Sequence, residues 1–147
     1  MKTLYFFILI ALVPVLSKAQ DIYEIKFTSG YTQYRCALAL WSDGSGKMRV
    51  RYYNNGSTRL VQQDMRLEKT SDGGMRIAGY NATYASTGYT ASSYSPDNFY
   101  ISQDEYGNMS CWNIDDTNHW AKASISSVKG YYTKQAFLGD FDWKLNY

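Results

Sequence analysis

The chain has 147 residues, of which 45% are hydrophobic and 19% charged, a composition that fits one folded domain and excludes disordered and collagen-like chains. Its 15 Tyr, 6 Phe and 4 Trp favour β-strands over helices. The formal net charge of +2 is too small for the long-range field that attracts nucleic acids or anionic membranes.

The first part of the chain, residues 1–19, has the pattern of a cleaved secretory signal. Residues 4–16 form an uncharged apolar run, and small residues occupy both positions that the signal peptidase reads before Gln20. This run is shorter than the roughly 18 apolar residues that a membrane-spanning helix needs. We therefore expect a secreted or periplasmic protein, without membrane insertion, whose single domain covers residues 20–147.

Cleavage before Gln20 changes the charge balance of the protein. It removes Lys2 and Lys18, which leaves 13 of the 15 basic residues against 13 acidic ones. The mature chain then carries no net charge, and we expect no nucleic-acid partner.

Apolar and polar residues alternate with a period of two in several runs, which is typical of half-buried strands. In residues 47–52 the side chains of Met48, Val50 and Tyr52 share one face, and basic side chains share the other. Asp, Asn, Ser and Gly between the runs favour tight turns. We predict an all-β fold, a single antiparallel barrel or sandwich of about eight or nine short strands. The other expected strands are residues 22–27, 34–40, 59–69, 75–80, 98–102, 108–114 and 121–128.

The tail of the chain has two interpretations. Residues 134–138 have the composition of one helical turn that ends before Gly139, whereas residues 141–143 alternate as an edge strand would. Both remain open from the sequence.

Cys36 and Cys111 are the only cysteines of the chain. An even pair of cysteines in an exported protein is a candidate disulfide, and strand parity places both side chains on inward faces. We therefore predict a disulfide between them, with two buried thiols as the alternative. Two cysteines and the single His119 are too few ligands for a metal site, so neither a metal nor a cofactor is expected.

No motif marks a catalytic residue. A Ser or Cys nucleophile usually needs a histidine base, and His119 lies in a polar turn. Any two acidic residues could form the pair that glycoside hydrolysis needs, but most of them lie in expected turns, where Asp caps backbone N–H groups. The acidic cluster at 115–116 is interpreted in the same way. The sequence therefore favours a binding module over an enzyme.

The most informative segment is residues 79–100, in which tyrosines recur among Ser, Thr, Ala and Gly. Tyrosine offers a rigid ring and one hydroxyl at low entropy cost, and binding surfaces combine it with small polar residues. We predict that Tyr84, Tyr89 and Tyr94, which have the smallest neighbours, contact a ligand. The alternative is that these rings cover an open end of the barrel.

These observations lead to one main functional hypothesis and two alternatives. The main hypothesis is a secreted, non-catalytic β-domain that binds a glycan or a protein partner through the tyrosine-rich loop. The first alternative is a lipocalin-like barrel for a small apolar ligand, with Tyr34, Leu38, Val50 and Tyr52 on its cavity wall. The second is a small hydrolase that uses carboxylates.

Overall fold

The structure is a computed structural model that describes residues 20–144, so the expected signal at 1–19 lies outside the described residues. It contains eight strands and one helix. The elements are β1 (Gln20–Ser29), β2 (Thr32–Trp41), β3 (Ser45–Asn54), β4 (Ser57–Lys69), β5 (Met75–Tyr84), β6 (Asn98–Gln103), β7 (Met109–Ile114), β8 (Trp120–Val128) and α1 (Tyr131–Gly139).

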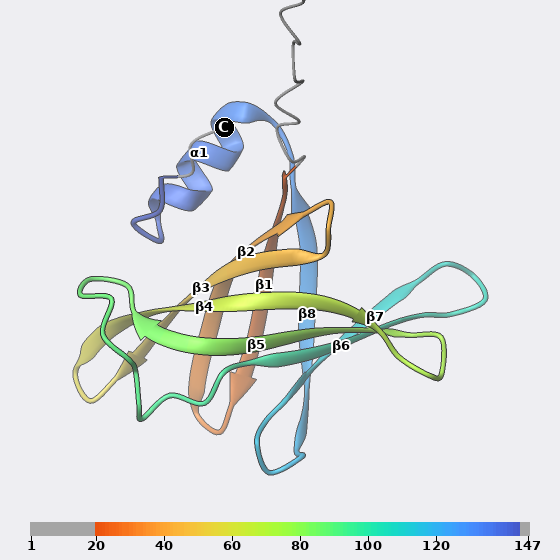
Figure 1. Cartoon of the computed structure of the whole chain (residues 1–147), viewed down its shortest axis with the longest axis horizontal. Helices are drawn as coiled ribbons and strands as arrows, with labels where there is room; N and C mark the ends of the chain where they lie inside the picture. Colours follow the sequence, from red (N-terminus) through yellow and green to blue (C-terminus); the bar gives the residue numbers. More distant parts are fainter. Residues whose placement is uncertain (1–19, 145–147) are drawn as a thin grey trace, which may run out of the picture.

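The strands form a closed antiparallel barrel in chain order, and β1 pairs with β8 to close it (Figure 1). The predicted all-β fold is confirmed, and of the two predicted architectures the chain adopts the barrel. Because consecutive strands run up and down, the connections after β1, β3, β5 and β7 meet at one end of the barrel. We call this the long-loop end, since it holds the connection of residues 85–97.

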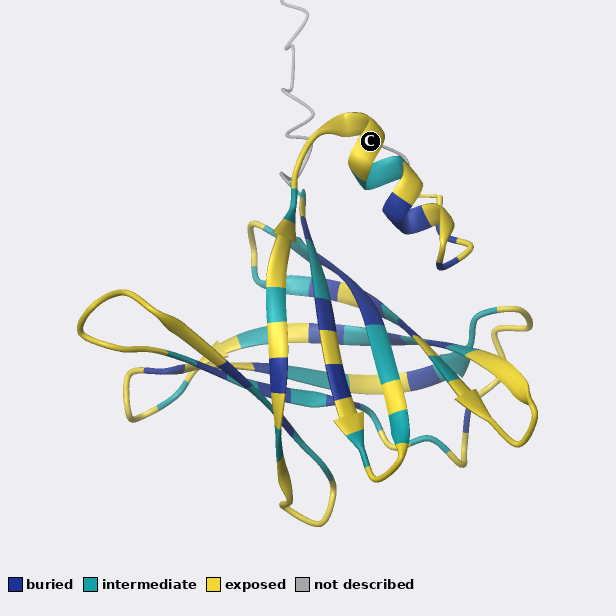
Figure 2. Ribbon diagram, turned by 180° about the vertical axis from the view of Figure 1, so that it is seen from behind, coloured by how far each residue is buried: buried dark blue, intermediate teal, exposed yellow. Residues whose placement is uncertain are grey.

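Strand alternation fills the interior of the barrel with side chains. In β3, Met48 and Val50 are fully buried while Lys47 and Arg51 are exposed, as the sequence predicts. Figure 2 shows buried and exposed residues alternating along the strands. The interior therefore has the packed character of a small barrel with few strands. The main core cluster consists of Ile25, Phe27, Cys36, Leu38, Met48, Val50, Met65, Ile77, Phe99, Ile101, Cys111 and Ala123.

The predicted disulfide is not formed, because Cys36 and Cys111 are both free thiols, although both point into the core as expected. Cys36 lies on β2 and Cys111 on β7, with β1 and β8 between them. Three inter-strand steps of about 4.8 Å each separate their backbones around the wall, whereas a disulfide needs Cα atoms within about 7 Å. Burial raises the pKa of the Cys111 thiol to about 11 and raises that of the Cys36 thiol well above its ordinary value.

Helix α1 covers the outer face of β2 (Figure 1). Ala37 and Ala39, whose side chains point away from the barrel interior, are fully buried because Phe137, Leu138 and their neighbours pack on them. Alanine at these positions leaves room for the helix to approach the strand. Of the two interpretations of the tail, the helix is correct, and residues 141–143 form a turn instead of an edge strand. No helix within residues 20–144 is long and apolar enough to cross a membrane.

Arginines on the outer face of β2 and β3 hold the end of α1. The Arg49 guanidinium donates hydrogen bonds to the carbonyls of Phe141 and Asp142 at 3.0 and 2.6 Å. Arg51 donates to the Asp140 carbonyl at 3.2 Å, and Arg35 pairs with the Asp140 carboxylate at 3.0 Å. These donors satisfy the carbonyls of the turn that follows the helix, whereas the last carbonyls of the helix accept from the backbone N–H groups of residues 140–143.

Candidate functional site

Four aromatic rings form a continuous stack at the long-loop end, and we call it the aromatic ladder. Phe27 and Tyr34 are cross-strand neighbours whose rings stack at 4.8 Å, and Tyr52 follows at 5.2 Å from Tyr34. Tyr94, from the connection between β5 and β6, completes it at 5.5 Å from Tyr52. Such contacts between rings stabilise a fold beyond the area they bury. The ladder joins three strands to the long connection.

The three tyrosines predicted to contact a ligand lie in different environments. Tyr94 packs on Tyr52 and belongs to the barrel core. Tyr84 is half-buried, with its hydroxyl 3.4 Å from that of Ser93. Tyr89 is 76% exposed. The structure thus brings Tyr84 and Tyr94 into the packing that covers the barrel end, and only Tyr89 of the three presents its ring to solvent.

A buried polar network fastens the tyrosine-rich connection to the barrel. The Asp97 carboxylate accepts hydrogen bonds from the Tyr94 hydroxyl at 2.5 Å and from the Gln63 side-chain amide at 2.7 Å. The side-chain oxygen of Gln63 in turn accepts a hydrogen bond from the Asp97 backbone N–H at 2.9 Å. Gln63 is 1% exposed and Asp97 9%. Such a satisfied network fixes one arrangement of the chain, whereas a broken one is costly.

Burial raises the pKa of the Asp97 carboxyl to about 6, although hydrogen bonds from Tyr94, Gln63 and Asn113 favour its charged form. Burial and the neighbouring Asp97 charge raise the pKa of Tyr94 well above its usual value. The tyrosine therefore remains a hydrogen-bond donor at neutral pH. Sequence reasoning missed Gln63 and Asp97, since neither residue lies in a motif. The one sequence signal at this position is the Pro96-Asp97 pair, which places an acidic residue directly before the start of β6.

The network depends on a close approach of backbones at Gly79. The hydrogen-bonded pairing of β4 with β5 shifts register between Gln62 and Asp64, so Gln63 lies at a β-bulge. A Cβ added at Gly79 would lie 2.5 Å from the Asp97 carbonyl oxygen and 2.7 Å from the Gln63 side-chain oxygen. Glycine is thus the residue that lets Asp97 and Gln63 meet beside β5.

We expect the Gly79→Ala substitution to lower the free energy of unfolding by about 2–3 kcal/mol, because backbone atoms must move to admit the methyl group. Gly139→Ala is the matched control, since nothing lies within 4 Å of a Cβ there. The control is expected to leave stability unchanged or to raise it by up to about 1 kcal/mol. Urea unfolding of both variants measures the difference, and equal stabilities would contradict the close approach.

A small cavity of about 190 Å³ opens beside the aromatic ladder. Its lining includes three residues of the ladder, Phe27, Tyr34 and Tyr94, and three acidic residues, Asp97, Asp115 and Asp116. Asp115 is held by the turn that it caps, where it accepts from the backbone N–H groups of Thr117 and His119. These contacts lower its pKa. The cavity is large enough for a few atoms of a ligand.

Three exposed tyrosines surround the long-loop end. Tyr31 in the β1–β2 turn is fully exposed, Tyr53 at the end of β3 is 64% exposed, and Tyr89 in the β5–β6 connection is 76% exposed. Sequence reasoning missed Tyr31 and Tyr53. The signal that identifies them is their place beside the Gly30 and Asn55-Gly56 turns, because both turns lie at the long-loop end once the barrel closes.

The comparisons with known proteins give no family. The chain matches no protein-family model, no curated protein and no solved structure.

Proposed function

We propose that this protein is a non-catalytic binding barrel that recognises a glycan at its long-loop end. The observation that supports this function is the set of exposed rings of Tyr31, Tyr53 and Tyr89, which lie in or next to three connections at the same end of the barrel. An exposed tyrosine buries apolar area when a sugar stacks on its face, and its hydroxyl keeps a polar contact. The aromatic ladder lies at the same end of the barrel.

The packing of the interior favours this function over the transport of a small apolar ligand inside the barrel. Leu38 and Val50, which such a cavity would need on its wall, are fully buried in the core cluster. Tyr34 and Tyr52 belong to the aromatic ladder. An internal ligand would have to displace these contacts.

The expected result on a glycan array is that Tyr31→Ala and Tyr89→Ala each weaken capture about fivefold, since one stacked ring contributes on the order of 1 kcal/mol. Tyr106→Ala is the matched control, because Tyr106 is 82% exposed in the β6–β7 connection at the opposite end of the barrel. If the control weakens capture as much as the other two variants, or if the unaltered protein captures no glycan, the proposed function is wrong.

One observation favours a second function, hydrolysis by a pair of carboxylates. Asp97 and Asp115 border the same cavity, and their pKa values are shifted in opposite directions, as in an acid and base pair. Against this function, both carboxylates already accept several hydrogen bonds within the fold. Release of reducing sugar from a glycan by the unaltered protein, and its loss in Asp97→Asn, would establish the hydrolase instead.

A further inference from the structure

A hollow with a volume of about 840 Å³ lies on the outer face of the barrel. It extends over β8, β1, β2, β3 and the start of β4. Four of its lining residues are cationic, and no acidic residue lines it. These cations are Lys26, Arg35, Arg51 and Lys122.

Three of the cations stand directly opposite one another on adjacent strands. Lys26 on β1 faces Arg35 on β2, which faces Arg51 on β3. Like charges directly opposite in a sheet are destabilising. A row of cations of this kind attracts a ligand of opposite charge.

Two carboxylates compensate part of this charge. Glu24 accepts from Arg35 at 2.8 Å and pairs with Lys26 at 3.0 Å. Asp140 pairs with Arg35 at 3.0 Å. Neither acid is among the residues that line the hollow, whose charged lining residues are all cationic. The hollow itself therefore presents positive charge.

The other side chains of the hollow suit a sugar. Thr28, Gln33, Thr58 and Ser124 offer hydroxyl and amide groups, and the exposed ring of Tyr53 lies beside them. Five neighbouring strands give the hollow a width, measured along the curved wall of the barrel, of roughly 19 Å at about 4.8 Å per inter-strand step. This width admits several linked sugar units.

We propose that the outer hollow binds an acidic saccharide, with the carboxylate or sulfate groups on its cations and a sugar ring on Tyr53. This inference rests on the glycan-binding function proposed above and specifies the charge of the glycan. A single-stranded nucleic acid fits less well, because such sites stack successive bases on several aromatic rings. Tyr53 is the only strongly exposed ring among the residues that line this hollow.

The test uses three oligosaccharides of similar length, namely a heparin-derived sulfated one, an oligogalacturonate and uncharged cellohexaose. Calorimetry is expected to detect binding of a charged probe, weakened by added salt, and the two charged probes distinguish sulfate from carboxylate recognition. Combined substitution of Lys26→Gln and Lys122→Gln should weaken that binding about fivefold or more. Both lysines are exposed, so the variant is expected to fold.

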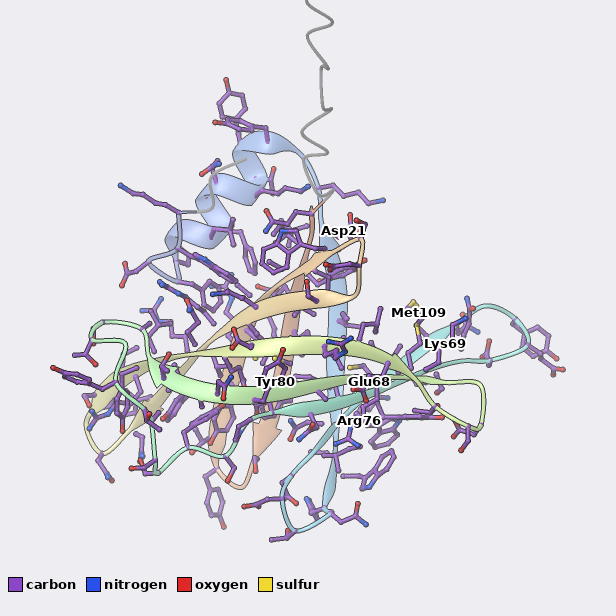
Figure 3. The ribbon with its side chains drawn as sticks, viewed as in Figure 1. Asp21, Glu68, Lys69, Arg76, Tyr80 and Met109 are labelled. Carbon is purple, nitrogen blue, oxygen red and sulfur yellow. The ribbon has the colours of Figure 1, made fainter. Side chains whose placement is uncertain are left out.

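Lys69→Gln is the matched control, because Lys69 is exposed, does not line this hollow and lies at the end of β4 beside Glu68 (Figure 3). It should change binding by less than about twofold. Tighter binding of cellohexaose that depends on Tyr31 and Tyr89 would overturn this inference and leave the proposed function intact. Binding of a charged saccharide that depends on the lysines but not on these tyrosines would support the outer hollow and overturn glycan recognition at the long-loop end. Preference for a single-stranded oligonucleotide, used as a fourth probe in the same calorimetry, would overturn both.

Discussion

Tyr94→Ala is expected to lower the free energy of unfolding by about 3–5 kcal/mol, the usual cost of truncating a packed aromatic side chain. The ring lies 5.5 Å from that of Tyr52 and packs on Val61, Ala82 and Ala91. Its hydroxyl also donates to the buried Asp97 carboxylate. Denaturant unfolding measures the loss. Tyr94→Phe keeps the ring and removes this donor, so it should cost about 1–3 kcal/mol.

Tyr89→Ala is the matched control for this measurement. Tyr89 lies in the same connection but is 76% exposed, so its removal should change the free energy of unfolding by less than about 0.5 kcal/mol. Losses of similar size at Tyr89 and Tyr94 would contradict the division of this connection into a packed part and an exposed part. No loss at Tyr94 would mean that the connection does not close the barrel end.

Much of the fold could be predicted from the sequence, because local patterns determine the strands. In residues 47–52 alternation assigns each side chain to the correct face, since a strand has a period of two whatever its neighbours. The turns between strands carry glycine or asparagine at positive φ, for example Asn55 and Gly56. Short hairpins then leave few topologies other than an up-and-down sheet.

The remaining features depend on contacts between distant parts of the chain. Parity shows that Cys36 and Cys111 point inward, but their separation follows from the order of strands around the closed barrel. The tail forms a helix because Phe137 and Leu138 pack on the outer face of β2 at Ala37 and Ala39. Because all three have small neighbours, Tyr84, Tyr89 and Tyr94 could not be distinguished by sequence. Tyr94 differs because Asp97 binds its hydroxyl, and Gln63 holds Asp97 in turn.

We also expect Asp97 to make the stability of the protein depend on pH. The pKa of its carboxyl is about 6 in the folded protein, against an ordinary value of 3.8. The folded state therefore binds the proton more tightly, and the stability that protonated Asp97 contributes is complete below about pH 4 and lost as the pH rises through 6. This difference between the pKa of Asp97 in the folded protein and its ordinary value corresponds to roughly 3 kcal/mol in the free energy of unfolding. Comparison with Asp97→Asn, which cannot ionise, isolates this contribution.

Unfolding free energies of both proteins between pH 2 and 8 test this prediction. The stability of the unaltered protein minus that of Asp97→Asn should fall by roughly 3 kcal/mol between about pH 4 and 7. Asp72→Asn is the control of opposite sign, because hydrogen bonds from Thr70, Tyr100 and Gly74 lower the pKa of the Asp72 carboxyl to about 2. Against this variant the unaltered protein should gain stability as the pH rises from about 2 to about 4. A flat difference for Asp97 would mean that water reaches its carboxylate, and the tyrosine-rich connection would then be open in solution.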